Sequence, residues 1–197
     1  LIQLGKLTEL TGGGLRFRQT TLILGSEIEI YDPQCLGPIH VLTYFQTLEK
    51  MRDFSQWMSH HVKNISLSTQ RIYVDGRALQ KKVHELDGLF IPAHVFTPFK
   101  SLYGKGVKDS LREVFDPKYI DAIELGLSSD TNMVGKIQEI QNYSFTTNSD
   151  AHSLPKIARE YQKLRLHDKT FLELKKALHY EDGRAIIANY GLNPLLG

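Results

Sequence analysis

Hydrophobic and polar positions follow two different periods along the chain, and segments of the two kinds alternate. Apolar residues spaced three and four apart predict amphipathic helices, which are expected at residues 47–63, 77–86, 109–115, 132–141, from 154 onward and at 169–179. Runs rich in β-branched and aromatic residues predict strands, at residues 15–18, 21–24, 27–30, 39–45, 89–98, 120–127, 144–150, 163–166 and 184–188. This βαβα rhythm predicts an α/β fold with buried parallel strands.

Composition limits the class of protein. The chain has 197 residues, 41% of them hydrophobic, which is enough for one core, so a single domain over 1–197 is expected. Its 24 Lys and Arg against 22 Asp and Glu give a net charge of +2, which neither announces nor forbids nucleic-acid binding. Cys35 is the single cysteine, no apolar run approaches the ~18 residues of a membrane span, and no signal-peptide pattern is present. We therefore expect a reducing, cytoplasmic setting and no membrane partner.

The first candidate for chemistry is the polar cluster at residues 148–152, Asn-Ser-Asp-Ala-His, at the end of a predicted strand. If extended geometry persists, Asp150 and His152 leave the backbone on the same side. A carboxylate and an imidazole aimed together suit a divalent metal ion. The alternative is a helix cap, in which Ser149 or Asp150 caps the helix that begins near Leu154.

Three further candidates lie in other predicted strands. Glu27 and Glu29 alternate with isoleucines, a pattern that also fits an ordinary solvated strand face. His40 is the second residue of its strand, where a lone histidine is more often a hydrogen-bonded structural residue than a ligand. His94 lies between two prolines at the end of a buried strand, and the prolines fix the backbone around its imidazole.

Together these residues form a mixed nitrogen and oxygen ligand set without cysteine. That set suits catalytic Zn²⁺, with Mn²⁺ or Mg²⁺ as alternatives, better than a closed structural zinc. Barrel-like α/β folds gather the loops after their strands at one rim, which would bring together Glu27, His40, His94, Asp150 and His152. So many ligands predict more than one metal ion, and two-metal sites commonly cleave phosphate esters.

The loop at residues 99–108 combines lysines, glycines and aromatic side chains. It does not match the G-x-x-x-x-G-K-[ST] pattern, so nucleotide hydrolysis of that kind is unsupported. Interleaved lysines and aromatics suit phosphate contact and base stacking, and a solvated lid fits equally well.

Taken jointly, several short motifs resemble the PHP (polymerase and histidinol phosphatase) superfamily, and most closely its endonuclease Q family. The motifs are Gly-Ser-Glu-Ile-Glu-Ile-Tyr at 25–31, the strand histidine His40, Pro-Ala-His-Val-Phe-Thr-Pro at 92–98, Glu-Leu-Gly-Leu-Ser-Ser-Asp at 124–130 and Thr-Asn-Ser-Asp-Ala-His at 147–152. The resemblance implies a distorted seven-stranded β/α (TIM-like) barrel with a multinuclear metal site. It also implies a DNA repair enzyme that nicks DNA 5′ to deaminated bases such as uracil and hypoxanthine, or 5′ to abasic sites.

The resemblance assigns roles to residues of this chain. Glu27 would be a metal-bridging carboxylate, His40 and His94 imidazole ligands, and Asp150 and His152 the ligands of the last motif; Glu27, Asp150 and His152 would be the catalytic residues. Damaged DNA would be contacted by side chains on and just before the lysine-rich loop, namely Phe96, Lys100, Tyr103 and Lys105. Cys35 is expected to be a spectator thiol.

The superfamily's opening His-x-His motif, and the aspartate and histidine that follow it, are absent from this sequence, which starts at Leu1. We therefore expect a PHP-type domain truncated at its N-terminus, an incomplete barrel that by itself is weakly active or inactive. Its open strand edges would favour homo-oligomers. Two other functions stay open: a PHP phosphatase acting on a small phosphomonoester, and an inactive barrel that serves as a DNA-binding or scaffold module.

Overall fold

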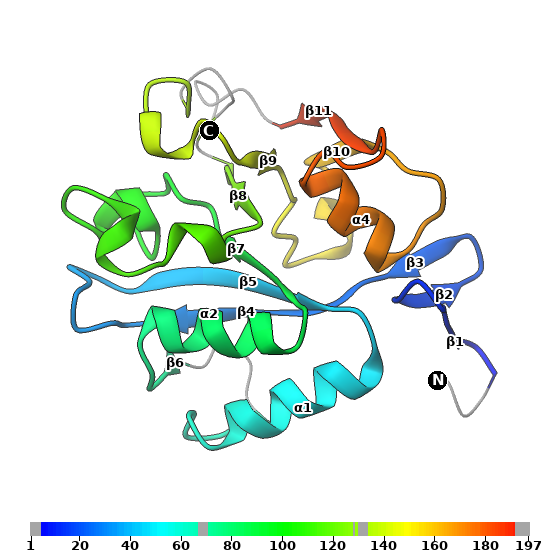
Figure 1. Cartoon of the computed structure of the whole chain (residues 1–197), viewed down its shortest axis with the longest axis horizontal. Coiled ribbons are helices and arrows are strands. Elements are labelled where there is room, and N and C mark those ends of the chain that lie inside the picture. Colours follow the sequence, from blue (N-terminus) through cyan, green and yellow to red (C-terminus); the bar gives the residue numbers. More distant parts are fainter. Residues whose placement is uncertain (1–4, 67–70, 128, 130–133, 192–197) are drawn as a thin grey trace.

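The strands that position Glu27, His40 and His94 belong to one four-stranded sheet. The computed structural model describes residues 5–66, 71–127, 129 and 134–191. The sheet has the order β6-β4-β5-β7 and consists of β4 (Leu24–Ile30), β5 (Ile39–Phe45), β6 (Arg71–Ile72) and β7 (Leu89–Pro92). It runs through the middle of the molecule (Figure 1). The start of the helix predicted at 132–141 and part of the motif at 124–130 lie outside the described residues.

Strands β4 and β5 pair antiparallel, and β5 pairs antiparallel with β7, which corrects the expectation of parallel strands here. Only residues 31–38 connect β4 to β5. A parallel connection needs a crossover of about a dozen residues or more, so this short link can only return the chain alongside itself. Glu27 and His40 consequently lie within the body of their strands, whereas His94 follows the end of β7 as expected.

Helices α1 (Leu48–Ser59) and α2 (Gly76–Glu85) lie on the same side of the β4–β5 ribbon (Figure 1). Both helices have a side-chain cap: Thr47 accepts a hydrogen bond from Lys50 N, and Asp75 accepts one from Ala78 N. Their apolar stripes pack on the inward face of the sheet in one core, which includes Ile28, Ile30, Val41, Phe45, Phe54, Leu79 and Val83. The strand face that carries Ile28 and Ile30 is thus buried, and Glu27 and Glu29 project from the other face.

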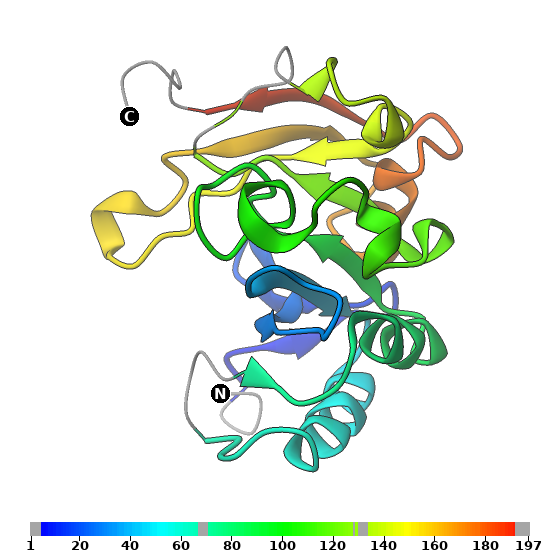
Figure 2. The same cartoon turned by 90° about the vertical axis from the view of Figure 1, so that its left-hand side faces the viewer.

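The second half of the chain extends this arrangement (Figure 2). Strands β8 (Ala122–Glu124) and β9 (Ser144–Thr146) pair parallel, and β10 (Tyr161–Arg165) pairs antiparallel with β11 (Ala185–Tyr190). Asp121 N donates to Phe90 O at 3.0 Å, which joins β8 to β7. Asn189 Nδ2 donates to Phe145 O at 3.0 Å, which joins β11 to β9.

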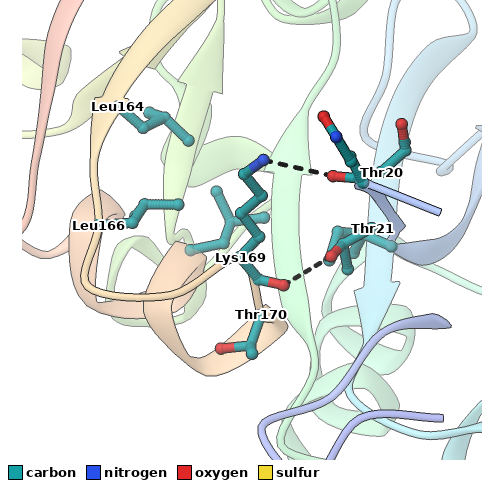
Figure 3. A pocket seen from close by; sticks show the side chains of 9 residues that line it. Thr20, Thr21, Leu164, Leu166, Lys169 and Thr170 are labelled. Atoms are coloured by element: carbon teal, nitrogen blue, oxygen red, sulfur yellow. Dashed lines mark hydrogen bonds between the residues drawn. The ribbon is translucent and has the colours of Figure 1, made fainter. Parts of the chain in front are cut away.

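The N-terminal sheet lies beside the start of α4, near residue 171. It consists of β1 (Thr8–Glu9), β2 (Leu15–Phe17) and β3 (Thr20–Leu22). The carbonyl groups of Gly12 and Gly13 accept from the first N–H groups of α4 (Phe171–Leu178). A hollow of about 360 Å³ lies between β3 and the segment before α4. Lys169 crosses it (Figure 3): its amine donates to Gln19 O at 3.3 Å and its carbonyl accepts from Thr21 Oγ1 at 2.7 Å.

The expected barrel is not confirmed among the described strands, and some of the expected helices are shorter than predicted. The described strands form four hydrogen-bonded sheets, and no closed barrel is found among them, so the seven-stranded TIM-like barrel is not confirmed. The helices predicted at 109–115 and from 154 onward are only short 3₁₀ turns, at Leu111–Glu113 and Leu154–Lys156, and the described end of the helix predicted at 132–141 has a 3₁₀ turn at Gln138–Ile140. Each turn buries one side chain or none, and a helix without a buried apolar stripe is marginal in water.

No helix in the described part of the chain is long and apolar enough to cross a membrane. Oligomers through open strand edges, and the extent of the domain, stay predictions.

Candidate metal centre

Glu27, His40 and His94 converge on one point of the exposed sheet face. The Glu27 carboxylate makes a short contact with His40 Nδ1, and its Oε1 lies 3.3 Å from His94 Nε2. Ligand atoms of the three residues all lie within 4.8 Å of one another. Ligands of one tetrahedral zinc ion lie about 3–4 Å apart, so small side-chain rotations would close the set around one ion.

The hydrogen bonds of His94 favour a metal ligand at its Nε2. Thr97 Oγ1 donates to the carbonyl oxygens of His94 and Phe99, both at 3.0 Å, and lies 3.1 Å from His94 Nδ1. Because the hydroxyl hydrogen is used there, its oxygen accepts from an Nδ1–H group, and the Nε2 lone pair faces the Glu27 carboxylate. Two lone pairs that face each other in this way need a cation between them, either a proton or a metal ion. The residues therefore fit a divalent metal.

Glu29 belongs to this centre, although the alternating pattern allowed it to be an ordinary solvated residue. Its Oε2 lies 3.4 Å from His40 Nε2 and 2.9 Å from Lys100 Nζ, and its Oε1 lies 2.9 Å from Arg71. The two nitrogens of His40 thus face Glu27 and Glu29, one on each side. Alternation places both acids on one strand face, and only the register of β4 opposite β5 reveals their shared partner.

Glu124 lies at the end of β8 and accepts a hydrogen bond from the backbone of His94. It was not predicted as a site residue. It is 5% exposed, and its Oε2 accepts from His94 N at 2.9 Å while its Oε1 accepts from Asn148 Nδ2 at 2.6 Å. The signal in the sequence was a carboxylate directly after the apolar pair Ala122 and Ile123. An acid in a buried strand requires partners, but the sequence does not say which.

The electrostatics of the centre follow from these contacts. Hydrogen bonds from His40 and then His94 hold the pKa of Glu27 well below its usual range, against the effect of burial. Burial opposes a charged His94, but the hydrogen bond to Glu27 together with the charges of Glu27, Glu124 and Asp150 raises the His94 pKa above its ordinary value. Burial raises the pKa of Glu124, and its two donors offset this in part. Cys35 is buried, and burial raises its pKa to about 11, as expected of an inert thiol.

Asp150 and His152 line the same hollow but stand apart from the inner three residues. Strand β9 ends at Thr146, and Asp150 has φ +43°, so the extended geometry assumed for this pair is absent. His152 Nδ1 lies 2.9 Å from Asp150 O, and 80% of its side chain is exposed. The predicted helix cap is also absent: the turn that follows has Ser153 at its N-cap and no side-chain cap hydrogen bond.

Side chains on and just before the lysine-rich loop lie in two places, some in the hollow and some against the core. Lys100 lines the hollow, whereas Phe96 and Tyr103 stack on each other with ring centroids 5.6 Å apart and pack against the core. Tyr103 also donates to Glu139 at 2.7 Å. An aromatic residue that was not predicted, Phe99, lines the hollow and is 70% exposed, with Lys105 Nζ 5.2 Å from its ring centroid.

The hollow has a volume of about 410 Å³. It is lined by acids, imidazoles, a lysine and neutral side chains, namely Glu27, His40, His94, Thr97, Phe99, Lys100, Glu124, Gly126, Leu127, Asn148, Asp150 and His152. The fold and this site define an α/β protein with a carboxylate–imidazole centre that can hold a divalent metal.

Comparisons with solved structures agree with this fold. The structure is similar to the lesion-specific endonuclease PfuEndoQ from Pyrococcus furiosus, with a TM-score of 0.88 and 34% identity over 98% of this chain. It is also similar to endonuclease Q in complex with a 27-mer duplex substrate that has an abasic lesion at the active site, with a TM-score of 0.87 and 32% identity. In both cases the match covers 48% of the other chain.

The curated relatives are themselves uncharacterized. The chain is 61% identical over 196 residues to the uncharacterized protein YqxK of Bacillus subtilis, of which it spans 51%. It is 35% identical over 139 residues to the uncharacterized protein MJ0043 of Methanocaldococcus jannaschii, of which the match covers 17%. The chain thus spans about half the length, or less, of the relatives it matches. No protein-family model matches it.

Proposed function

We propose that the chain carries the metal centre of a DNA repair endonuclease of the endonuclease Q type, a PHP-type phosphodiesterase that nicks DNA 5′ to deaminated bases or abasic sites. The observation that supports this most is the convergence of Glu27, His40 and His94 in one hollow, on a fold with a TM-score of 0.88 to a lesion-specific endonuclease. Zn²⁺ is the preferred ion, because the ligands are imidazole and carboxylate.

A bound divalent ion would supply an activated water and would stabilise charge on the scissile phosphate. Glu27 would ligate between the two imidazoles, with His40 bonding through Nδ1 and His94 through Nε2. Asp150 and His152 would complete the site from the opposite side of the hollow. Glu27 already lies at hydrogen-bond distance from both imidazoles, so these three residues would hold the first ion. The outer pair would bind a further ion or the water that attacks the phosphate.

Damaged DNA would approach over the lysine-rich loop. Lys100 Nζ, now paired with Glu29, can turn to a phosphate, and Lys105 adds a second positive charge beside the ring of Phe99. An exposed ring at the mouth of the hollow suits stacking with an unpaired base. Phe96 and Tyr103, which pack inward, would support this loop.

The test is a nicking assay with the full-length protein and Zn²⁺ or Mn²⁺. The substrates are end-labelled duplexes with one uracil, one hypoxanthine or one abasic site, and the matched undamaged duplex is the control. We expect one nick on the 5′ side of each lesion, none in the undamaged duplex, and loss of nicking after metal chelation. Turnover of a generic phosphomonoester without nicking would favour a phosphatase, and DNA binding by a metal-free protein would favour a scaffold.

A further inference from the structure

We infer that Glu124 is a positioning residue: it holds the loop of His94 and the loop of Asp150 in register around the metal centre. This inference rests on the proposed function, because it concerns ligands of the proposed metal. Glu124 is 5% exposed, and both of its carboxylate oxygens are engaged by donors from two different loops.

The contacts form one continuous relay. Thr147 N donates to Gln162 Oε1 at 2.8 Å, and Gln162 Nε2 donates to Asn148 Oδ1 at 3.2 Å. Asn148 Nδ2 donates to Glu124 Oε1 at 2.6 Å, and Glu124 Oε2 accepts from His94 N at 2.9 Å. The relay therefore joins β10 to the loop after β9, then to β8, and finally to the loop after β7.

The direction of every bond in this relay is fixed by its two ends. The backbone N–H groups of Thr147 and His94 can only donate. Gln162 and Asn148 each accept at one end and donate at the other, so the relay needs one group that accepts on both sides. A carboxylate does this and an amide does not, so position 124 requires a carboxylate, which Glu124 supplies. With Gln at position 124, one NH₂ group must face another donor. Flipping the amides of Asn148 and Gln162 only moves this pair of facing donors to another bond of the relay.

The relay acts on His94 at a point where the backbone is already unusual. His94 has φ +32°, and it packs directly on Gly126, where a Cβ atom would lie 2.6 Å from the His94 Cβ. An L-residue with positive φ is maintained only by its surroundings. The hydrogen bond from His94 N to Glu124 and the bare Gly126 backbone belong to those surroundings, together with the contacts of Thr97.

The same relay reaches the outer ligands. Asn148 precedes Asp150 by two residues, and both residues line the hollow. The hydrogen bond from Asn148 to Glu124 therefore fixes the position of the loop two residues before Asp150. One buried carboxylate thus determines the spacing between the inner three ligands and the outer pair.

The experiment measures Zn²⁺ affinity of the full-length protein by competition with a chromophoric chelator, together with the melting temperature of the metal-free protein. The variants are Glu124→Gln, Asn148→Asp and the double variant Glu124→Gln/Asn148→Asp. Loss of an outer partner of a metal ligand weakens affinity by about 10–100-fold, which we expect for Glu124→Gln. Asn148→Asp alone places a second carboxylate against Glu124 and should weaken affinity as well.

The double variant restores the relay, because the carboxylate that accepts on both sides is moved from position 124 to position 148. Gln at 124 accepts from His94 N and donates to Asp at 148, which also accepts from Gln162. We expect its Zn²⁺ affinity and its metal-free melting temperature to return toward the wild-type values, whereas each single variant leaves two like groups facing each other in a buried site and melts at a lower temperature. This rescue is specific to positioning, because a role in stability alone would lower the metal-free melting temperature without changing zinc affinity.

The outcomes distinguish a failure of the positioning role of Glu124 from a failure of the proposed metal centre. If wild type binds zinc and Glu124→Gln binds it equally tightly, or if the double variant is as weak as the single variants, the positioning role is wrong and the proposed function stands. If wild type binds no divalent metal, the metal centre itself is wrong, and this inference is overturned with it.

Discussion

The three proposed inner ligands and the proposed outer pair differ in the contacts that fix their positions. Glu27 and His40 lie on adjacent, paired strands, and His94 is fixed by hydrogen bonds to Glu124 and Thr97. Asp150 and His152 lie beyond the end of β9 on a segment that projects from the molecule (Figure 2), and both side chains are largely exposed. Under the proposed assignment, strand pairing and these hydrogen bonds position the inner three residues before any metal binds, whereas the outer pair lies on the loop after β9.

This contrast predicts different losses for the two halves, and the largest belongs to the inner one. His94→Ala removes an Nε2 ligand and leaves Glu27 with one imidazole. We expect Zn²⁺ affinity to fall by more than the ~100-fold typical of an outer partner, and nicking to be lost with it. His60→Ala, which removes an exposed histidine elsewhere, is the matched control. Zinc competition and nicking assays measure both, and wild-type affinity in His94→Ala would refute the assignment.

The outer half should separate metal binding from cleavage. Asp150→Ala leaves the inner three ligands in place, so we expect at least one zinc ion per chain to remain by elemental analysis. Nicking of a uracil duplex should fall by about 100-fold or more, since metal stabilisation of the transition state is worth several kcal/mol. Normal cleavage by this variant would remove Asp150 from the centre.

A smaller effect is expected from the glycine beneath His94. Gly126 has φ +74°, and a Cβ there would meet the His94 Cβ at 2.6 Å. We expect Gly126→Ala to displace the imidazole and to weaken Zn²⁺ affinity by about 10-fold. Gly183→Ala is the matched control, because Gly183 also has positive φ (+78°) but has no atom within 4 Å of the added Cβ. Equal zinc affinities for both variants would show that the close approach is unimportant.

The smallest effect concerns a histidine–carboxylate pair outside the centre. His179 Nε2 lies 3.0 Å from Asp121 Oδ1, and this hydrogen bond raises the His179 pKa above its ordinary 6.5 despite burial. The raised pKa adds stability that is fully present below pH 6.5 and is lost as the pH rises through the folded-state pKa.

The pair is partly exposed, so its contribution is about 1 kcal/mol or less. Urea unfolding of His179→Gln should therefore show lower stability than wild type at pH 5.5, and the two should converge at alkaline pH with or without zinc. A difference that grows with pH would contradict this account.

The sequence singled out Glu27, His40 and His94, and the structure brings these three residues together, but their role as metal ligands stays a prediction. Each residue alone also fitted an ordinary structural role, and only their joint resemblance to a family motif set pointed to one site. The antiparallel return of β5 was missed, because strand partners are chosen by connection length and tertiary packing rather than by local pattern. Glu124 was missed because a single acid after two apolar residues carries no periodic signal.

The central claim is that Glu27, His40 and His94 hold a divalent metal ion. Anomalous diffraction at the zinc absorption edge, from crystals of the zinc-loaded full-length protein, tests it most directly. The account predicts an anomalous peak within about 2.0–2.2 Å of a Glu27 oxygen, His40 Nδ1 and His94 Nε2. A zinc-dependent, nicking-competent protein whose crystals show no peak there, or show zinc bound by other residues alone, would contradict it.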